Sequence, residues 1–600
     1  MASAAYQPLP TYPPSSSLPA HGPPYPLKPT SARLTLLTGL KYLIGTSAAL
    51  LVLHYVLIGA FPSSAYSARF QSSSSHRYTA AAALADDVLS RLDPSAGQPG
   101  TFFRDSQPIK TALAFLHLAE REVEARGLDT CKDQLGEALI DAYHSSELAY
   151  CLPEGEGLDV DGAFEPTALH LYLPSNATPP SRISCTPVHH AAFSKWWPYP
   201  AAPCFSTNLR TIAGEERKFR AVGCAVTEKG KALGREMGRE RYLGSEVVLE
   251  PLSGVECTER VERTVMVIGR QDQWNPFHVA EDLITTVVTM LIAAQTAPSL
   301  VETRLQLVFA EGYGMDTNHF TPLWDRMGAW APRRLSLDPW AEGVCLTNTI
   351  HSVGAGASLL SAMGVGKSYT CASTITWAAA HYYRHLFGLL PASLSRPTPS
   401  LASRSRSRSR GRRPINVLWL SRAKLDAQAQ KLNDNSPWRD VRHIDNEPAL
   451  VARLRAGLSS LCDSPAAFTT GCVFQDAQDE PEAWGLTSPE SVGDGTLLPV
   501  RFATLDPTVH ALETQIHFVG HATILVSSHG GALGLSLFLP PGDAAILELQ
   551  VDAVRGNFHF EHMAKEMGHG YEMLQTEKIV DVDRVWEVVH RWVKDVAESG

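Results

Sequence analysis

The residues best suited to chemistry form the loop Ser528-His529-Gly530-Gly531-Ala532, which follows a short apolar segment. We expect Ala522–Ser527 to be a buried strand and Ala532–Phe538 a short helix that Pro540-Pro541-Gly542 ends. A strand, a glycine turn and a helix start form an anion site, because free N–H groups and the positive helix end point the same way. The glycines let the backbone approach a diphosphate, and His529 adds a donor.

The loop lacks the full Gly-x-Gly-x-x-Gly pattern, since only Gly530, Gly531 and Gly534 are present. Glycine turns between strand and helix also occur in α/β proteins that bind no phosphate. An ordinary structural turn therefore stays open as the alternative interpretation.

Two basic residues follow another apolar segment, Ile415–Leu420, which is predicted to be a strand. Arg422 lies just past its end, where the fork of a guanidinium can grip a phosphate. Lys424 is a second candidate. The alternative for Arg422 is an ordinary surface ion pair.

A general base is expected at the start of the long apolar helix His278–Ala297. His278 and Asp282 are four residues apart and share one helix face, so either can accept a proton there, Asp282 first. Glu281 points about 100° away from Asp282, so only one of these carboxylates should face the site. Alternatively, Asp282 merely interacts with the positive helix end.

Two Asp-x-Asp triplets are the candidates for a metal site, because paired carboxylates can hold Mn²⁺. Asp159–Asp161 lies in a glycine-rich loop, and Asp581–Asp583 opens a helix, where aspartate is an ordinary cap. Both are predicted to be structural, so no metal is assigned, although dependence on Mn²⁺ stays open. Gly364–Ser368 looks like a phosphate-binding loop, but Ser361 stands where a glycine is required.

Composition describes an ordinary globular chain of 600 residues, with 44% hydrophobic and 19% charged residues and a net charge of -10. Such a charge argues against a nucleic-acid partner. Tyr42–Phe61 carries no charge and is long enough to span a bilayer. The preceding basic residues favour a cytosolic N-terminus, and a buried core helix is the alternative.

The ten cysteines suit an oxidising compartment, although their pairing cannot be deduced from the sequence. The absence of Cys-x-x-Cys argues against a zinc ribbon. Asn176-Ala177-Thr178 is the one N-glycosylation sequon.

Hydrophobic periodicity places further elements along the chain. The expected helices are Ile109–Glu124, Leu135–Leu148, Ala372–Leu390, Glu447–Leu461, Pro507–Glu513 and Asp583–Glu598. The expected strands are Val265–Gly269, Leu305–Phe309, Val344–Leu346, Val441–Ile444, Gln515–Phe518 and Ala544–Leu549. Pro153–Leu252 is expected to be irregular. Alternating strands and helices on both sides of a basic run predict an α/β fold of two Rossmann-like domains facing a cleft.

Four stretches together resemble glycosyltransferase family 61, and the likeness covers roughly Val265–Tyr571. They are Asn275-Pro276-Phe277-His278 followed by Asp282; Val344-Cys345-Leu346; Leu418-Trp419-Leu420-Ser421-Arg422; and Ser528–Leu533 continuing through Phe538–Gly542. The chain departs from the family at Gly531, where alanine is usual, and at Ala532, where a second glycine is usual.

The resemblance implies a GT-B architecture and a type II Golgi membrane enzyme with a lumenal catalytic part. It implies inverting transfer of a sugar from a UDP-sugar to a glycan or glycoprotein, with xylose as the first choice and GlcNAc as the alternative. Asp282 and His278 would be catalytic, while Arg422, Lys424 and Ser528–Ala532 would bind the donor. A non-catalytic transferase-like protein of the secretory pathway is the rival interpretation, and a splicing-associated scaffold is a third.

The expected organisation has six parts. These are a disordered cytosolic tail (1–41), a transmembrane signal anchor (42–61), a stem (62–99), an N-terminal part with the first Rossmann-like domain (100–390), a basic Ser/Arg linker (391–413) and a C-terminal nucleotide-sugar-binding Rossmann-like domain (414–600).

Overall fold

The structure is a computed structural model that describes residues 104–599 with gaps. The gaps are 132–135, 154–178, 189–200, 213–218, 238–246, 252–255, 271–274, 311–318, 336, 354–370, 390–413, 426, 428–441, 465–467, 469–470, 478–483, 485–496 and 552–553. The predicted tail, anchor, stem, Asn176 sequon, first Asp-x-Asp triplet and basic linker lie outside the described residues. All described residues belong to one compact unit, 78–600.

The C-terminal half contains a six-stranded sheet whose pairings are all parallel. Its strands are β11 (Ile415–Leu420), β12 (Cys472–Asp476), β13 (Leu498–Leu505), β14 (Ile524–Ser528), β15 (Ala545–Val551) and β16 (Gly570–Thr576). Their order is β12-β13-β11-β14-β15-β16. Every residue of β11 is buried, as expected for a parallel strand covered on both faces.

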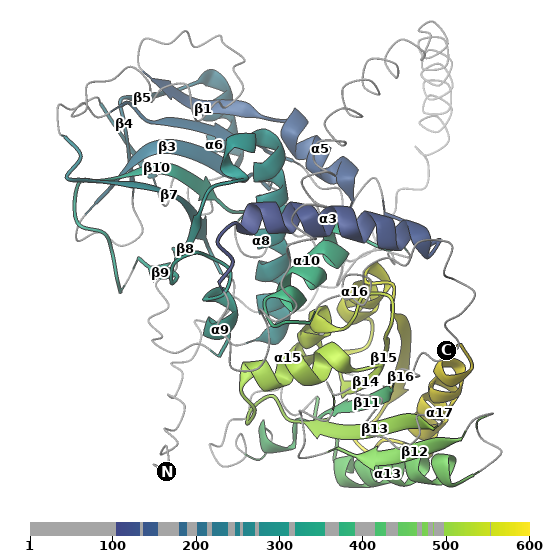
Figure 1. The fold of residues 1–600 in the computed structure, drawn as a ribbon. Helices are drawn as coiled ribbons and strands as arrows, with labels where there is room; N and C mark the ends of the chain where they lie inside the picture. Colours follow the sequence, from purple (N-terminus) through teal and green to yellow (C-terminus); the bar gives the residue numbers. More distant parts are fainter. Residues whose placement is uncertain are drawn as a thin grey trace, which may run out of the picture. The chain divides into compact units, whose positions relative to one another are not determined.

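Helices cover both faces of this sheet (Figure 1). One face carries α13 (Glu447–Asp463) and α17 (Val582–Ser599), which contact each other. The other face carries α15 (Leu512–His521), the 3₁₀ helix η6 (Gly531–Phe538) and α16 (His559–Glu566). Along β11, Trp419 packs in the apolar layer under α13 and α17, whereas Leu420 packs in the layer under α15, η6 and α16. Successive side chains of a pleated strand alternate between the two faces in this way.

The N-terminal half contains a ten-stranded mixed sheet. Its parallel part is β10 (Val344–His351), β7 (Glu259–Ile268), β8 (Leu305–Phe309) and β9 (Arg333–Arg334). An antiparallel part continues from β10 through β3 (Cys204–Thr211), β2 (Arg182–Cys185), β1 (Leu148–Pro153) and β5 (Cys224–Val226). In addition, β4 (Phe219–Val222) pairs with β3, and β6 (Val247–Glu250) pairs with β4 in parallel. The helices are α3 (Pro108–Ala125), α5 (Glu137–Ser145), α6 (Glu228–Met237), α8 (Pro276–Thr296), η2 (Pro298–Leu300), α9 (Thr321–Trp324) and α10 (Thr374–His385).

Helix α8 joins the two halves through one continuous apolar core. Its N-terminus meets η6 so closely that a Cβ at Gly534 would lie 2.5 Å from backbone atoms of Pro276 and Phe277. Among the described helices, α8 alone is long and apolar enough to cross a membrane, and it lies buried in this core. Arg384 of α10 adds hydrogen bonds to the carbonyls of Gly520 (2.8 Å) and Phe538 (2.6 Å).

The α/β fold is confirmed, and so are most long periodic helices and the buried strands. The expectation of an irregular Pro153–Leu252 was wrong, because β2 to β6 and α6 lie there. These strands are three to eight residues long and lie between proline- and cysteine-rich stretches, so their periodicity is hard to recognise.

Three further predictions in the C-terminal half were wrong. Gln515–Phe518 is part of α15 rather than a strand, because its short apolar alternation also fits one helix turn. Pro507–Glu513 is largely a turn, where the Gln515 side chain donates to the carbonyls of Pro507 and His510. The described part of Val441–Ile444 contains no strand, and β12, β13 and β16 were not predicted.

Five disulfides pair all ten cysteines. They join Cys131 to Cys371, Cys151 to Cys224, Cys185 to Cys204, Cys257 to Cys345 and Cys462 to Cys472. The first closes a chain segment of 240 residues, and such cross-links stabilise a fold chiefly by restricting the unfolded chain.

Candidate functional site

The strand order of the C-terminal sheet reverses direction between β11 and β14. The chain leaves β11 toward β13 and β12 on one side and continues from β14 toward β16 on the other. Ligands of open α/β sheets bind outside the carboxyl ends of the strands at such a reversal. Arg422 follows the end of β11 and His529 follows the end of β14, so the sheet brings these two predicted residues to one edge.

Two arginines lie against Gly530 at this edge. A Cβ at that position would be 2.9 Å from Nη1 of Arg422 and 3.7 Å from Cδ of Arg442. Burial lowers the pKa of Arg442, and the positive charge of Arg422 lowers it further. Arg422 lies against Gly530 through its guanidinium and Arg442 through its Cδ, so two cationic side chains share this edge, which suits a polyanion. Sequence reasoning missed Arg442, since no motif marks the turn between the described residues 442 and 446.

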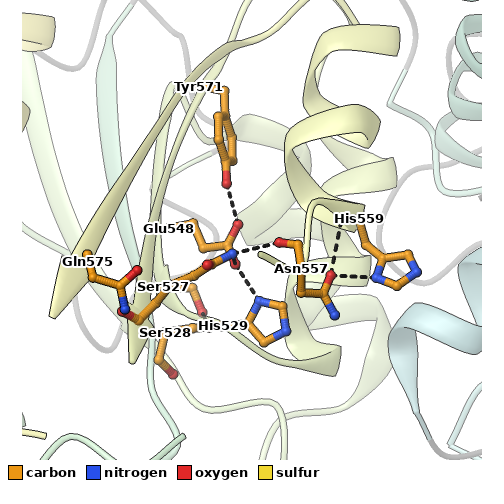
Figure 2. A network of polar contacts seen from close by, with 9 residues as sticks. Ser527, Ser528, His529, Glu548, Asn557, His559, Tyr571 and Gln575 are labelled. Atoms are coloured by element: carbon orange, nitrogen blue, oxygen red, sulfur yellow. Dashed lines mark hydrogen bonds and ion pairs between the residues drawn. The ribbon is translucent and has the colours of Figure 1, made fainter. Parts of the chain in front are cut away.

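His529 points its Nδ1 at the carboxylate of Glu548 (Figure 2). Both side chains are buried, and Glu548 has no exposed surface. The ring of Phe560 lies 5.2 Å from the imidazole, centroid to centroid. Backbone geometry supports this arrangement, because the N–H of His529 donates to the carbonyl of Leu549 on β15 (2.9 Å).

A second histidine–glutamate pair lies at the N-terminus of α8. Nδ1 of His278 is 2.6 Å from a carboxylate oxygen of Glu281, one helical turn on. The His278 side chain is 30% exposed and that of Glu281 only 2%, so the imidazole, not the carboxylate, can reach a ligand. Asn275 caps this helix by accepting from the N–H of Phe277 (3.1 Å).

The N-terminus of α8 and the glycine loop are direct neighbours. A Cβ at Gly531 would overlap Oδ1 of Asn275. Phe277 packs edge-on against His559, with ring centroids 4.9 Å apart. Burial lowers the pKa of His559 to about 4, while Glu281 opposes this and His529 and His278 contribute to it. Both histidines and Glu281 therefore lie within electrostatic reach of one group, His559.

Asp282 follows Glu281 on α8, but its side chain is directed toward α10. Its side chain is buried, and its charge adds to burial in raising the pKa of Tyr383 on α10 well above the ordinary value. The Tyr383 hydroxyl donates to the carbonyl of Leu283 (2.7 Å). Of the two adjacent carboxylates, Glu281 is thus the one paired with the predicted histidine.

The remaining predicted donor-binding residues occupy the same edge of the sheet. Ser528 is the buried last residue of β14, and Ala532 lies half-buried in the first turn of η6. Lys424 is exposed, and its backbone N–H donates to Asp506 at the end of β13 (3.1 Å).

Metal ligands do not gather in the described residues, where no three histidine, cysteine or acidic side chains come together. The second Asp-x-Asp triplet is a helix cap, as predicted. Oδ1 of Asp581 accepts from the N–H groups of Asp583 and Arg584, both at 3.1 Å.

The sequence matches no model of a known protein family, and a search among curated proteins finds no significant match.

Proposed function

We propose that the protein is an inverting glycosyltransferase that transfers a sugar from a UDP-sugar to a glycan or glycoprotein. The observation that carries this proposal is that Arg422 and Arg442 both lie against Gly530, at the point where the strand order reverses. A departing nucleoside diphosphate accumulates negative charge, and fixed cations aimed at that charge lower the barrier. Ser528–Ala532 and Lys424 complete the proposed donor site.

His278 is the base that the geometry supports best. The acceptor oxygen attacks the anomeric carbon, the bond from that carbon to the diphosphate oxygen breaks, and its electron pair leaves with UDP. The hydroxyl proton passes to Nε2 of His278, while Glu281 holds Nδ1 and balances the new positive charge. Asp282, the base favoured by sequence, is the alternative, although it lies buried beside Tyr383.

The sugar and the cellular setting come from the resemblance to family 61. It favours xylose over GlcNAc, a GT-B arrangement of two Rossmann-like domains and a Golgi membrane protein of type II. Five disulfides agree with a lumenal protein, because such bonds persist in oxidising compartments. The arginine pair suits a transferase that needs no obligatory metal, because it can supply the positive charge itself.

The test is release of UDP by the purified full-length chain. UDP-xylose, UDP-GlcNAc and other sugar nucleotides are offered singly, with and without EDTA. Release from one donor that survives EDTA is expected. Loss of activity in EDTA would indicate that a metal ion, rather than the two arginines, stabilises the charge of the leaving diphosphate. Silence with every donor, together with no thermal shift by UDP, would favour the non-catalytic interpretation.

A further inference from the structure

Glu548 is a buried carboxylate that collects three hydrogen-bond donors (Figure 2). Its Oε1 contacts Nδ1 of His529 and accepts from Nε2 of Gln550 at 3.0 Å. Its Oε2 accepts from the hydroxyl of Tyr571 at 2.5 Å. The donors come from three places, the loop after β14, β15 itself and β16. A carboxylate without exposed surface is costly unless such partners compensate its charge.

The pattern decides which nitrogen of His529 carries hydrogen. The amide nitrogen of Gln550 can only donate, so Oε1 of Glu548 is an acceptor. The same oxygen contacts Nδ1 of His529, and Nδ1 therefore donates. The other nitrogen, Nε2, lies on the side of the ring away from Glu548 (Figure 2).

The surroundings also hold the carboxylate and the ring in place. Gln550 donates to the carbonyl of Asn557 as well, at 2.7 Å. Phe560 stacks edge-on against the imidazole, which limits rotation of the ring. Hydrogen-bonded carboxylates behind a histidine fix its tautomer and orientation in other sites of this kind.

We propose that Glu548 is a positioning residue that keeps a proton on Nδ1 of His529 and so presents Nε2 to the diphosphate of the ligand. This inference rests on the proposed donor site. Because Nε2 of the neutral ring carries only a lone pair, it donates to a phosphate oxygen after it takes up a proton from solvent, and the carboxylate behind the ring compensates the positive charge of the imidazolium that results. Tyr571 and Gln550 act one step further back, by orienting Glu548.

The test combines nitrogen NMR of histidine-labelled full-length protein with UDP binding measured by calorimetry. His529→Ala assigns the imidazole signal. Glu548→Met removes the acceptor at similar volume, and Glu548→Gln retains an acceptor oxygen. Glu566→Gln is the matched control, because that buried glutamate contacts Thr376 and lies outside the network.

In the wild type, the neutral ring of His529 should carry its hydrogen on Nδ1. Glu548→Met should move the proton of the neutral ring to Nε2, and it should weaken UDP binding about 10- to 100-fold because the imidazolium loses the carboxylate that compensates its charge. Glu548→Gln should restore the tautomer and part of the affinity, whereas Glu566→Gln should leave both unchanged. In the His529→Ala background, Glu548→Met should cause no further loss.

An Nδ1 that is unprotonated in the neutral wild-type ring would overturn the proposal, as would equal losses of UDP affinity with and without His529. If Glu548→Met does not fold, the tautomers of His529 measured by NMR in the wild type and in Glu548→Gln still test the proposal. A wild type with the expected tautomer that binds no UDP would refute the donor site instead, so the two failures are distinguishable.

Discussion

Two histidines of the site each have a buried glutamate at Nδ1, yet they differ in exposure. The side chain of His278 is 30% exposed, whereas that of His529 is 4% exposed. A base must reach a mobile acceptor, while a group that grips a phosphate benefits from a fixed and desolvated position. The difference supports the proposed division of work between the two rings.

Removing the imidazole in His278→Ala should lower kcat by about 10²- to 10⁴-fold, the usual contribution of general base catalysis. UDP affinity should change little, because this ring acts on the acceptor. Single-turnover transfer and UDP calorimetry measure the two effects. Asp282→Asn is the comparison, and a larger loss of kcat there than in His278→Ala would transfer the role of base to Asp282.

Arg442→Ala should weaken UDP binding about 10- to 100-fold, as should Arg422→Ala, because each removes a charge-assisted contact to phosphate. Arg455→Ala is the control, since its guanidinium pairs with Asp476 on another part of the sheet. Affinities equal to the wild type in both site variants would remove the arginine pair from the ligand site.

Sequence reasoning reached several of these residues and not others, for identifiable reasons. His529, Gly530 and Arg422 directly follow buried strands, so their place at one sheet edge follows from the pattern. Arg442 precedes a turn without a motif, and only folding brings it to Gly530. At the start of α8, helical spacing alone could not decide whether Glu281 or Asp282 interacts with His278. On a buried helix the direction of a side chain also depends on the residues that pack around it.

At the scale of elements, η6 and the N-terminus of α8 hold the two parts of the site together. Their contact depends on a missing side chain at Gly534. The helix predicted at His278–Ala297 is confirmed as α8, but the sequence did not indicate that η6 packs against it. The antiparallel extension of the N-terminal sheet was not predictable, since its strands are short and several of them contain disulfide cysteines, so they show little periodicity.

Gly534→Ala should therefore destabilise the fold by about 1–3 kcal/mol, the usual cost of overpacking a rigid contact. The added methyl would lie 2.5 Å from backbone atoms that cannot rotate away. Differential scanning calorimetry should show a lower Tm and weaker UDP binding. Gly269→Ala is the control, because a Cβ there meets nothing within 4 Å. Equal Tm values for both variants would contradict the close packing.

For the whole molecule, buried titratable groups predict how stability depends on pH. Burial lowers the pKa to about 4 for His385 and His559 and to about 3 for His521 and His569. The unfolded chain protonates these rings near pH 6.5, so the stability present above that pH is lost as the pH falls.

Two buried acids act in the opposite sense. Burial raises the pKa of Asp105 to about 6 and that of Glu566 to about 8, so the folded chain keeps protons that the unfolded chain releases. Stability falls as the pH rises through these ranges. Below about pH 6.5 the loss of stability caused by the four histidines exceeds the gain from the two acids. Above that pH the main remaining effect is the loss caused by Glu566, so the Tm should be highest near pH 6.5. Glu566→Gln should flatten the alkaline side, and a wild-type Tm that climbs steadily to pH 8 would contradict this.

The central claim is that Arg422, Arg442 and the loop after β14 bind a nucleoside diphosphate. Calorimetry of UDP and uridine against the full-length chain tests it most directly, because the two ligands differ only in the diphosphate. We expect UDP to bind at least about 100-fold more tightly than uridine, and the gap to shrink in Arg422→Ala. Equal affinities for the two ligands, or binding of neither, would contradict the claim.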